Sequence, residues 1–475
     1  MTHWDSLALL ALLVPSGVAD DPQSPRKVAA VRSVEERARD IESLSDRIWS
    51  FAEIALRETR SAAALADYAE ARGFEVTRGV AGMPTAFVAA FGSGRPVIAI
   101  LGEFDALPGL SQKAVPVKAP LEPGAPGHGC GHNLFGPASL GAAAAIRDLI
   151  AAGDLRGTVR FYGTPAEESV GGKLYMVREG LFSDVDVAVA WHPSNETRAD
   201  TQSSQSMVDF VVEFEGKAAH AAFDPWNGRS ALDGLEIFTF ALNQMREHVR
   251  PSVRMHYSIL EGGDVPNVVP ERARLWCWLR DSKKKDVEAL LERAREIARG
   301  AAIAAGVEAR VVVRSGSYEM LVNMTGARKL HENLEWLGPI PFTDADEEFA
   351  RALQKATGVE PTGLKRTVEP FDESPGEPEG GSTDVADVSW VVPTLHFSVT
   401  TAPRDTPWHA WPVVACAGMS IGHRGMTHAA KAMAAIAVDL FEDEPLRIAI
   451  RDEFEKSVGD HVYAGFIPEG PPRRD

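Results

Sequence analysis

Three short segments carry the residue types that bind metal ions and move protons. Cys130 and His132 lie in the glycine-rich segment APGHGCGHNLFG. Glu167 and Glu168 form an adjacent pair, and His192 follows the apolar run VDVAVAW. A thiolate, imidazole nitrogens and a carboxylate are the ligands of a zinc-type site, and a catalytic site leaves one position open for water. In a glutamate pair, one carboxylate can bind metal while its neighbour takes a proton.

Each segment also has a plainer interpretation when it is considered alone. The first is then a loop with a buried thiol, the glutamate pair is a solvated surface, and the histidine bonds to backbone. Their positions relative to the predicted strands favour a shared site. The pair follows the strand TVRFYG and His192 follows the next strand, a spacing that suits one strand-helix-strand crossover. Because the carboxyl ends of parallel strands meet at one sheet edge, we expect the three segments to converge there.

The elements that position these residues alternate between strand and helix, which predicts an α/β domain with a mostly parallel central sheet. A different order, β-α-β-β-α-β, runs from about Met207 to Tyr318 and interrupts that domain. This is the order of a ferredoxin-like α+β unit. We therefore expect a discontinuous larger domain, a smaller inserted domain and short terminal segments, with boundaries at 1–24, 25–206, 207–318, 319–460 and 461–475.

Composition limits the classes of function. A chain of 475 residues exceeds what one hydrophobic core usually serves, which agrees with two domains. The formal net charge of −18 argues against a nucleic-acid partner. An anionic substrate would need a locally basic pocket to overcome that field. The three cysteines, Cys130, Cys277 and Cys416, do not form a disulfide framework.

The N-terminus carries a short apolar run, Leu7 to Val14, followed by small residues up to Ala19. This pattern predicts a signal peptide and a periplasmic or secreted protein. Asp5 and the lack of Lys or Arg before the run leave a cytoplasmic protein as the alternative. No later apolar run approaches the ~20 residues that a spanning helix needs, so no membrane partner is expected.

Nine motifs, spread from about residue 30 to 440, together resemble one protein family. They are GEFDALPG, GHGCGHNLFG, TPAEE, AWHP, GKAAHAA, GRSALD, PNVVP, GSTDVADVSW and TPWHAW. The set is similar to the aminoacylase and carboxypeptidase family of co-catalytic metal amidohydrolases, in the branch that includes auxin-conjugate hydrolases. The resemblance implies a phosphorylase/hydrolase-like catalytic domain, with residues 207–318 as a lid and dimerisation domain. Auxin-conjugate relatives carry Asp where this chain has Asn133, so their substrate range is not expected to transfer in full.

The resemblance also implies the site residues. Two divalent metal ions, zinc or manganese, would be held by Cys130, His132, Glu168, His192 and His409. Our hypothesis is that Cys130 bridges the metals, with His132 and His192 completing one site and Glu168 and His409 the other. Asp105 resembles a carboxylate that orients a ligand from outside the metal's own ligand set. Glu167 would be the general base that takes a proton from metal-activated water.

The implied activity is hydrolysis of the amide bond of N-acyl or N-aroyl amino acids, including p-aminobenzoyl-glutamate-like conjugates. Asn267 and Arg280 are candidates for holding the substrate carboxylate, although Arg280 also suits a strand-end salt bridge. The resemblance implies a homodimer through 207–318, in which His220 stabilises the oxyanion in the neighbour's site. A heteromer with a related subunit is a further possibility. Alternative functions are an aryl-amine aminohydrolase and a non-catalytic metal-binding partner subunit.

Two further histidines have competing interpretations. His128 matches a family histidine two positions before the cysteine, but a loop histidine bonded to backbone fits equally well. His396 lies in the apolar strand VVPTLHFSV, where we expect a satisfied core residue.

Overall fold

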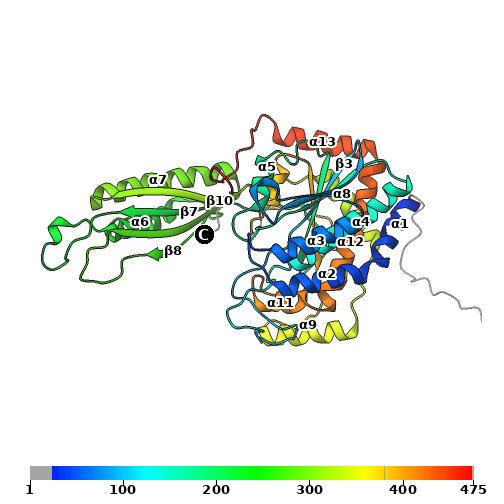
Figure 1. Ribbon diagram of the computed structural model, residues 1–475, viewed down its shortest axis with the longest axis horizontal. Coiled ribbons are helices and arrows are strands. Elements are labelled where there is room, and N and C mark those ends of the chain that lie inside the picture. Colours follow the sequence, from blue (N-terminus) through cyan, green and yellow to red (C-terminus); the bar gives the residue numbers. More distant parts are fainter. Residues whose placement is uncertain (1–23, 379, 473–475) are drawn as a thin grey trace, which may run out of the picture.

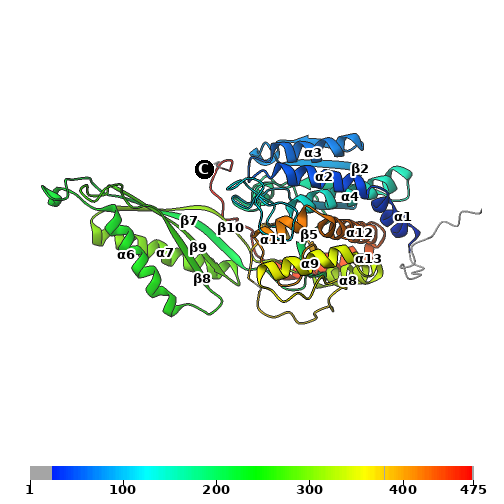
Figure 2. The same ribbon diagram turned by 90° about the horizontal axis from the view of Figure 1, so that it is seen from below.

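The computed structural model describes residues 24–378 and 380–472, which form a large lobe and a smaller elongated lobe (Figure 1). The expected signal peptide, apart from Ser24, lies outside the described residues. The smaller lobe consists of the chain between the two halves of the large lobe (Figures 1 and 2).

The large lobe is built on a sheet that, within 24–378 and 380–472, has seven strands in the order β1-β2-β4-β3-β5-β11-β6. The four neighbours β4, β3, β5 and β11 are parallel, whereas β1, β2 and β6 pair antiparallel at the edges. The sheet as a whole is therefore mixed, and the predicted parallel arrangement holds at its centre. The strands are β1 (Glu75–Arg78), β2 (Phe87–Ser93), β3 (Val97–Gly102), β4 (Gly157–Gly163), β5 (Val187–Ser194), β6 (Arg198–Ala199) and β11 (Thr394–Thr400).

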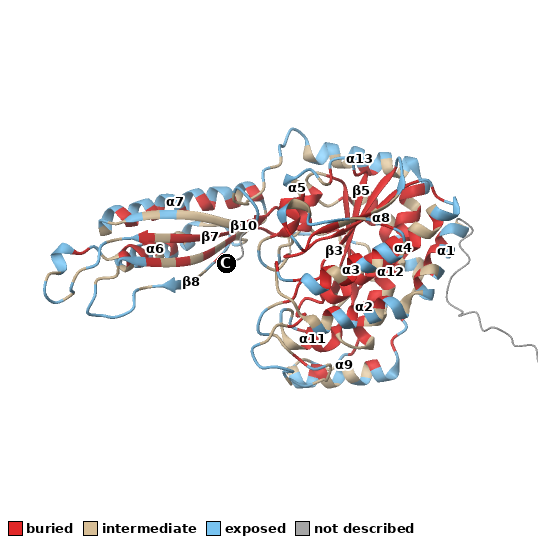
Figure 3. Cartoon of the chain, viewed as in Figure 1, coloured by how far each residue is buried: buried red, intermediate tan, exposed pale blue. Residues whose placement is uncertain are grey.

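Helices cover this sheet and bury its central strands β3, β4, β5 and β11 almost completely, whereas the edge strand β1 stays largely exposed (Figure 3). The long helices α4 and α12 pack against each other, α4 over β3, β4 and β5 and α12 over β5 and β11. The helices of this lobe are α1 (Pro25–Glu36), α2 (Ala38–Phe51), α3 (Thr59–Ala71), α4 (His132–Ala152), α5 (Gly172–Arg178), α8 (Met324–Leu337), α9 (Asp344–Thr357), α10 (Val385–Ser389), α11 (Trp411–Ala417), α12 (Ser420–Glu442) and α13 (Glu444–Val458).

Helix α4 lies close to the sheet because its sequence is rich in small residues. A Cβ atom at Gly136 would lie 2.8 Å from the carbonyl oxygen of Glu103, at the carboxyl end of β3. This approach brings the first turn of α4 to the edge where we expect the site. Within the described part of the chain, α4 alone is long and apolar enough to span a membrane, contrary to the expectation of no such run. However, 78% of its apolar window is buried inside the lobe, as in a core helix.

The smaller lobe has the β-α-β-β-α-β order that the sequence predicts, and its antiparallel sheet has the order β10-β7-β9-β8. One face of this sheet is covered by two helices, and Leu275, Cys277 and Leu279 of β9 are buried there. The alternate residues of β9 point to the other face, which is open. The elements are β7 (Ser206–Glu215), α6 (Ala231–Met245), β8 (Arg254–Glu261), β9 (Arg272–Asp281), α7 (Lys284–Ala305) and β10 (Glu308–Ser317).

The described part of the C-terminal segment packs where the two lobes join. The Tyr318 hydroxyl, just beyond β10, lies 3.1 Å from Nε2 of His461. The Tyr463 hydroxyl donates to Asp387 of α10 at 2.8 Å. These contacts tie the end of the chain to the lobe junction (Figure 1).

Candidate functional site

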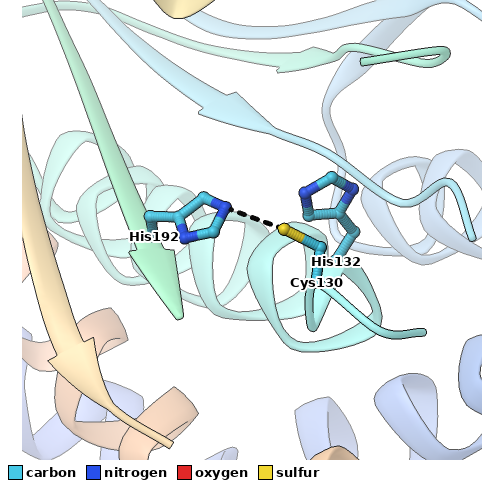
Figure 4. Close-up of side chains that lie close together, drawn as sticks. All are labelled: Cys130, His132 and His192. Carbon is cyan, nitrogen blue, oxygen red and sulfur yellow. Dashed lines mark hydrogen bonds between the residues drawn. The ribbon is translucent and has the colours of Figure 1, made fainter. Parts of the chain in front are cut away.

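Cys130, His132 and His192 converge at the carboxyl edge of the large sheet (Figure 4). Gly131 takes a left-handed conformation, with φ of 81°, and thereby turns the chain from Cys130 into the first residue of α4. The Sγ atom of Cys130 lies 3.4 Å from Nε2 of His192. His192 directs its Nδ1 to the carbonyl of Pro193 at 2.7 Å, which leaves Nε2 facing the thiol. One donor atom from each of the three side chains lies within 4.8 Å of the others.

A second group shares Cys130 and adds Glu168 and His409, again with donor atoms within 4.8 Å of one another. Nε2 of His409 lies 3.5 Å from Oε2 of Glu168. His409 has a φ of 52° and Ala166, just before the glutamate pair, a φ of 63°. Both are non-glycine residues in the left-handed region, a strain that is found at sites where the surrounding structure fixes a functional side chain.

Asp105 links His132 to the glutamate pair. Its Oδ1 lies 2.9 Å from Nδ1 of His132, and its Oδ2 accepts a hydrogen bond from the backbone N–H of Glu168 at 2.9 Å. All of these groups are buried or nearly so. Asp105 therefore sets the orientation of the imidazole and the position of the glutamate together.

The structure adds a buried network that sequence reasoning missed. Nζ of Lys173 donates to Glu103 and to Asp384, at 2.6 Å each, and its side chain is fully buried. The other carboxylate oxygen of Glu103 lies 3.0 Å from Nε2 of His132. In the sequence, this network corresponds to Glu103 in GEFD and Lys173 in GGK. Neither motif indicates that the two side chains are in contact.

Burial and crowded charge govern the ionisation of the site. Burial raises the pKa of Glu168 to about 7. Burial, with the added charge of Glu103, also raises the pKa of Glu167 well above its usual value. The pKa of the Cys130 thiol is raised by burial and by the charge of Glu168. When ionised, these acidic groups repel one another and are poorly solvated. Bound cations would therefore stabilise the site.

The donor set fits divalent metal ions. Among the described residues, Oε2 of Glu103, Nε2 of His132 and Oε1 of Glu168 are buried without a well-aligned hydrogen bond, although the first two lie 3.0 Å apart. Such orphaned groups are costly in a folded protein unless a ligand satisfies them. A third group of donor atoms within 4.8 Å of one another comprises Glu103, His132 and Glu167. Sulfur, nitrogen and carboxylate oxygen donors in adjoining groups suit zinc-type ions.

The cluster opens into a cleft of about 710 Å³ between the two lobes. Glu167, His192 and His409 line it from the large lobe, and Trp278 and Arg280 line it from the smaller lobe. No hydrogen-bond partner for the Glu167 carboxylate is found within 24–378 and 380–472. A partly buried acid that faces an open cleft beside a candidate metal cluster can accept a proton from bound water.

Comparisons with known proteins agree with this geometry. A family model described as a peptidase dimerisation domain, M20_dimer, matches residues 203–305. The B subunit of p-aminobenzoyl-glutamate hydrolase from Escherichia coli is 37% identical over 93% of this chain and 96% of that protein. The chain belongs to the M20 peptidase family. The resemblance to a family of metal amidohydrolases, inferred from the nine motifs, agrees with that similarity.

Other M20-type proteins extend the comparison. A mouse Xaa-Arg dipeptidase is 30% identical over 90% of this chain and 92% of its own length. A dinuclear metal-binding peptidase of the M20 family from Bacillus subtilis has the same fold, with a TM-score of 0.56 and 19% identity, over 86% of this chain and 99% of that one. The M20 relatives are hydrolases and peptidases, and this chain is a metal-dependent hydrolase of that family.

Within one chain, His220 and Asn267 lie far from the candidate metal ligands around Cys130. Met207, at the start of β7, lines the cleft, whereas His220 follows the opposite end of this ten-residue strand. At about 3.3 Å per residue, the two ends are roughly 30 Å apart. Asn267 lies beside His220, where its carbonyl accepts a hydrogen bond from Ala221 at 3.0 Å. Of the three residues of the smaller lobe that were predicted to join the site, Arg280 is the one that lines the cleft.

Of three further polar residues, His128 and Asn133 are buried and hydrogen-bonded, whereas His396 lines the cleft. His128 is buried and bonds through Nε2 to the carbonyl of Ile48 at 3.1 Å, as the backbone-bonded alternative predicts. Asn133 donates to Ser45 and to the carbonyl of Ala417, at 3.0 Å each. His396 differs from the expected core residue, because its ring lines the cleft while Nδ1 contacts Asp200 at 2.7 Å.

Proposed function

We propose that this chain hydrolyses the amide bond of N-acyl or N-aroyl amino acids, with p-aminobenzoyl-glutamate as the leading substrate. The observation that carries the proposal is the partly buried Glu167, without a hydrogen-bond partner in the described residues, at the cleft beside the two candidate metal-binding groups that share Cys130. A relative whose name specifies that substrate is similar along nearly the whole chain. A general base at this position suits attack of water on a carbonyl held in the cleft.

Two divalent ions, zinc or manganese, would be held by the two donor groups that include Cys130. His132 and His192 complete one group, and Glu168 and His409 complete the other. When bound, such ions polarise a substrate carbonyl and acidify water. Asp105 holds the imidazole of His132 through Nδ1, so that Nε2 faces the cluster.

Glu167 has the central role in proton transfer. Its carboxylate takes a proton from the attacking water and then delivers it to the nitrogen of the leaving amine. The amide C–N bond breaks, and the products are a carboxylate and a free amino acid. Glu168, held by Asp105 through its backbone, stays a ligand while its neighbour moves the proton.

Arg280 is the candidate group for the substrate's carboxylate. Its guanidinium lies 5.1 Å from the ring centre of Trp278, and Nη1 donates to Ser382 at 3.4 Å. Among the described residues it has no carboxylate within ion-pair distance, unlike the strand-end salt bridge that was the alternative. Trp278 and Trp408, which line the same cleft, offer apolar surface to an aromatic acyl group.

We further propose a homodimer through the smaller lobe, in which His220 and Asn267 reach the partner's cleft. The family model that matches this region is a dimerisation domain. Apolar side chains exposed on α6 and β8, among them Phe240 and Ile259, support an interface there. A heteromer with a related subunit is the alternative, because the Escherichia coli relative is named as one subunit of an enzyme.

For localisation, we propose export to the periplasm or the medium, with the cytoplasm as the alternative. The support is the apolar segment Leu7 to Val14 and the small residues that follow it. Cell fractionation and N-terminal sequencing of the mature protein test this, since export predicts a mature chain that starts after Ala19.

The activity is tested by incubating protein of measured metal content with a panel of N-acyl and N-aroyl amino acids. Mass spectrometry should detect a free amino acid and the free acyl acid, and a chelator should abolish their formation until zinc or manganese is restored. Release of ammonia in place of an amino acid would identify an aminohydrolase. Absence of turnover across the panel would favour a metal-binding partner subunit.

A further inference from the structure

A second cleft adjoins the first and shares Trp278 and Arg280 with it. Its wall on the smaller lobe carries Arg254 and His256, from the edge strand β8. Glu377 alone, among the described residues that line it, is acidic, and its Oε2 accepts a hydrogen bond from Ser282 at 3.2 Å. The second cleft therefore has a basic wall in a chain whose net charge is −18.

Arg254 and Arg280 are directly opposite each other in the antiparallel pair β8–β9, and His256 is opposite Trp278. Like charges at directly opposed positions destabilise a sheet. No carboxylate lies within ion-pair distance of either arginine in the described part of the chain. By contrast, Arg274, further along the same face of β9, has Glu213 at 3.5 Å. Within the part of the chain that the structure describes, these two positive charges at the cleft thus have no carboxylate in an ion pair with them.

The bonding of Arg254 leaves its charge available. Its Nη1 donates to the carbonyls of Pro251 and Val253, at 2.5 and 2.9 Å, which fixes the guanidinium without neutralising it. Arg280 lines the first cleft together with Glu167. Arg254 and Arg280 both line the second cleft, and because opposed residues have Cβ atoms about 5 Å apart, the two side chains extend from neighbouring positions on one wall.

We propose that Arg254, assisted by His256, binds the side-chain carboxylate of an acidic amino acid whose α-carboxylate is bound by Arg280. The enzyme then selects N-acyl derivatives of glutamate over those of glutamine, which differ by one charge and hardly in shape. This inference rests on the proposed function and deepens it, because it names the class of amino acid that the cleft accepts. The two arginines supply the basic pocket that an anionic substrate requires here.

The test compares kcat/KM for p-aminobenzoyl-glutamate and p-aminobenzoyl-glutamine in wild type and in Arg254→Gln. Wild type should prefer the glutamate substrate. Arg254→Gln should lower kcat/KM for that substrate by roughly 10- to 100-fold, mainly through KM, because a charged hydrogen bond is lost. For the glutamine substrate, kcat/KM should fall by much less, so the ratio between the two substrates should drop. Arg254→Lys should keep the preference, and His256→Gln should weaken it in the same direction.

The matched control is Arg250→Gln, which removes an exposed arginine that pairs with Asp286 and does not line either cleft. It should leave the ratio between the two substrates as in wild type. An unchanged ratio in Arg254→Gln would overturn the proposal. An equal loss for both substrates, with a shift to monomer in analytical ultracentrifugation, would also overturn it and assign Arg254 to a subunit interface. If wild type cleaves neither substrate, the proposed function itself fails, and the inference fails with it.

Discussion

Nζ of Lys173 lies 2.6 Å from Oε1 of Glu103, and both side chains are buried beneath the candidate metal cluster. The other oxygen of Glu103 lies 3.0 Å from His132, so this ion pair fixes an acid directly beside a candidate ligand. Asp384 completes the network at 2.6 Å from the same Nζ. A buried charge with two oppositely charged partners holds the neighbouring side chains in place. Removing one member of the network leaves a buried charge without its partner.

Lys173→Met should destabilise the protein because it removes the cation while leaving two carboxylates buried. The free energy of unfolding should fall by about 3–5 kcal/mol, the range for breaking a buried ion pair. Urea unfolding followed by circular dichroism measures it. Adding Asp384→Asn to this variant should recover part of the loss, whereas an unchanged midpoint in the single variant would contradict the structural role.

Glu167→Gln should abolish turnover while metal remains bound, because the amide keeps the shape of the side chain but cannot accept the proton. The expected loss in kcat is about 10²–10⁴-fold. Steady-state kinetics together with metal analysis by mass spectrometry test both parts. Turnover near that of wild type would remove Glu167 from its role as base.

Cys130→Ala should lower metal content, because Cys130 belongs to two of the three donor groups. The thiolate is also the softest donor of the set and favours zinc. Metal stoichiometry after dialysis is the direct measurement, and Cys277→Ala, in the core of the smaller lobe, is the control. Full stoichiometry in Cys130→Ala would show that this residue is not a ligand.

His428 should make stability depend on pH. Burial, aided by the charge of Lys431, lowers its pKa from 6.5 to about 3 in the folded chain. Between those values the unfolded chain binds more protons, so the free energy of unfolding falls as pH drops below 6.5. The loss is about 2 kcal/mol at pH 5. His428→Gln should remove this difference between pH 7 and pH 5, whereas His248→Gln, at an exposed position, should preserve it.

His220 should act in the partner's site if the proposed dimer is correct. An inactive His220→Ala chain mixed with an inactive Glu167→Gln chain should regain activity, because a mixed dimer contains one composite site with both residues intact. Subunit exchange is verified by native mass spectrometry. No recovery after proven exchange would exclude action of His220 on the neighbouring chain.

The sequence by itself determined which elements form and which residue types end them. Alternating strands and helices with polar endings predict that Glu168 and His192 emerge at one sheet edge, since a parallel sheet places all its carboxyl ends there. The order of elements between Met207 and Tyr318 likewise predicts the smaller lobe. Both inferences depend on local periodicity and on a general rule of sheet topology, so they can be made from the amino-acid sequence alone.

Only the tertiary structure decided which distant side chains meet. Lys173 and Asp384 are in contact because α5 and α10 pack together. His396 leaves the expected core because β6 pairs with β11 and brings Asp200 beside it. Arg254 opposes Arg280 through the register of two strands. Helix packing and strand register depend on the summed fit of many side chains, which local periodicity does not specify, and so these contacts follow from the folded chain alone.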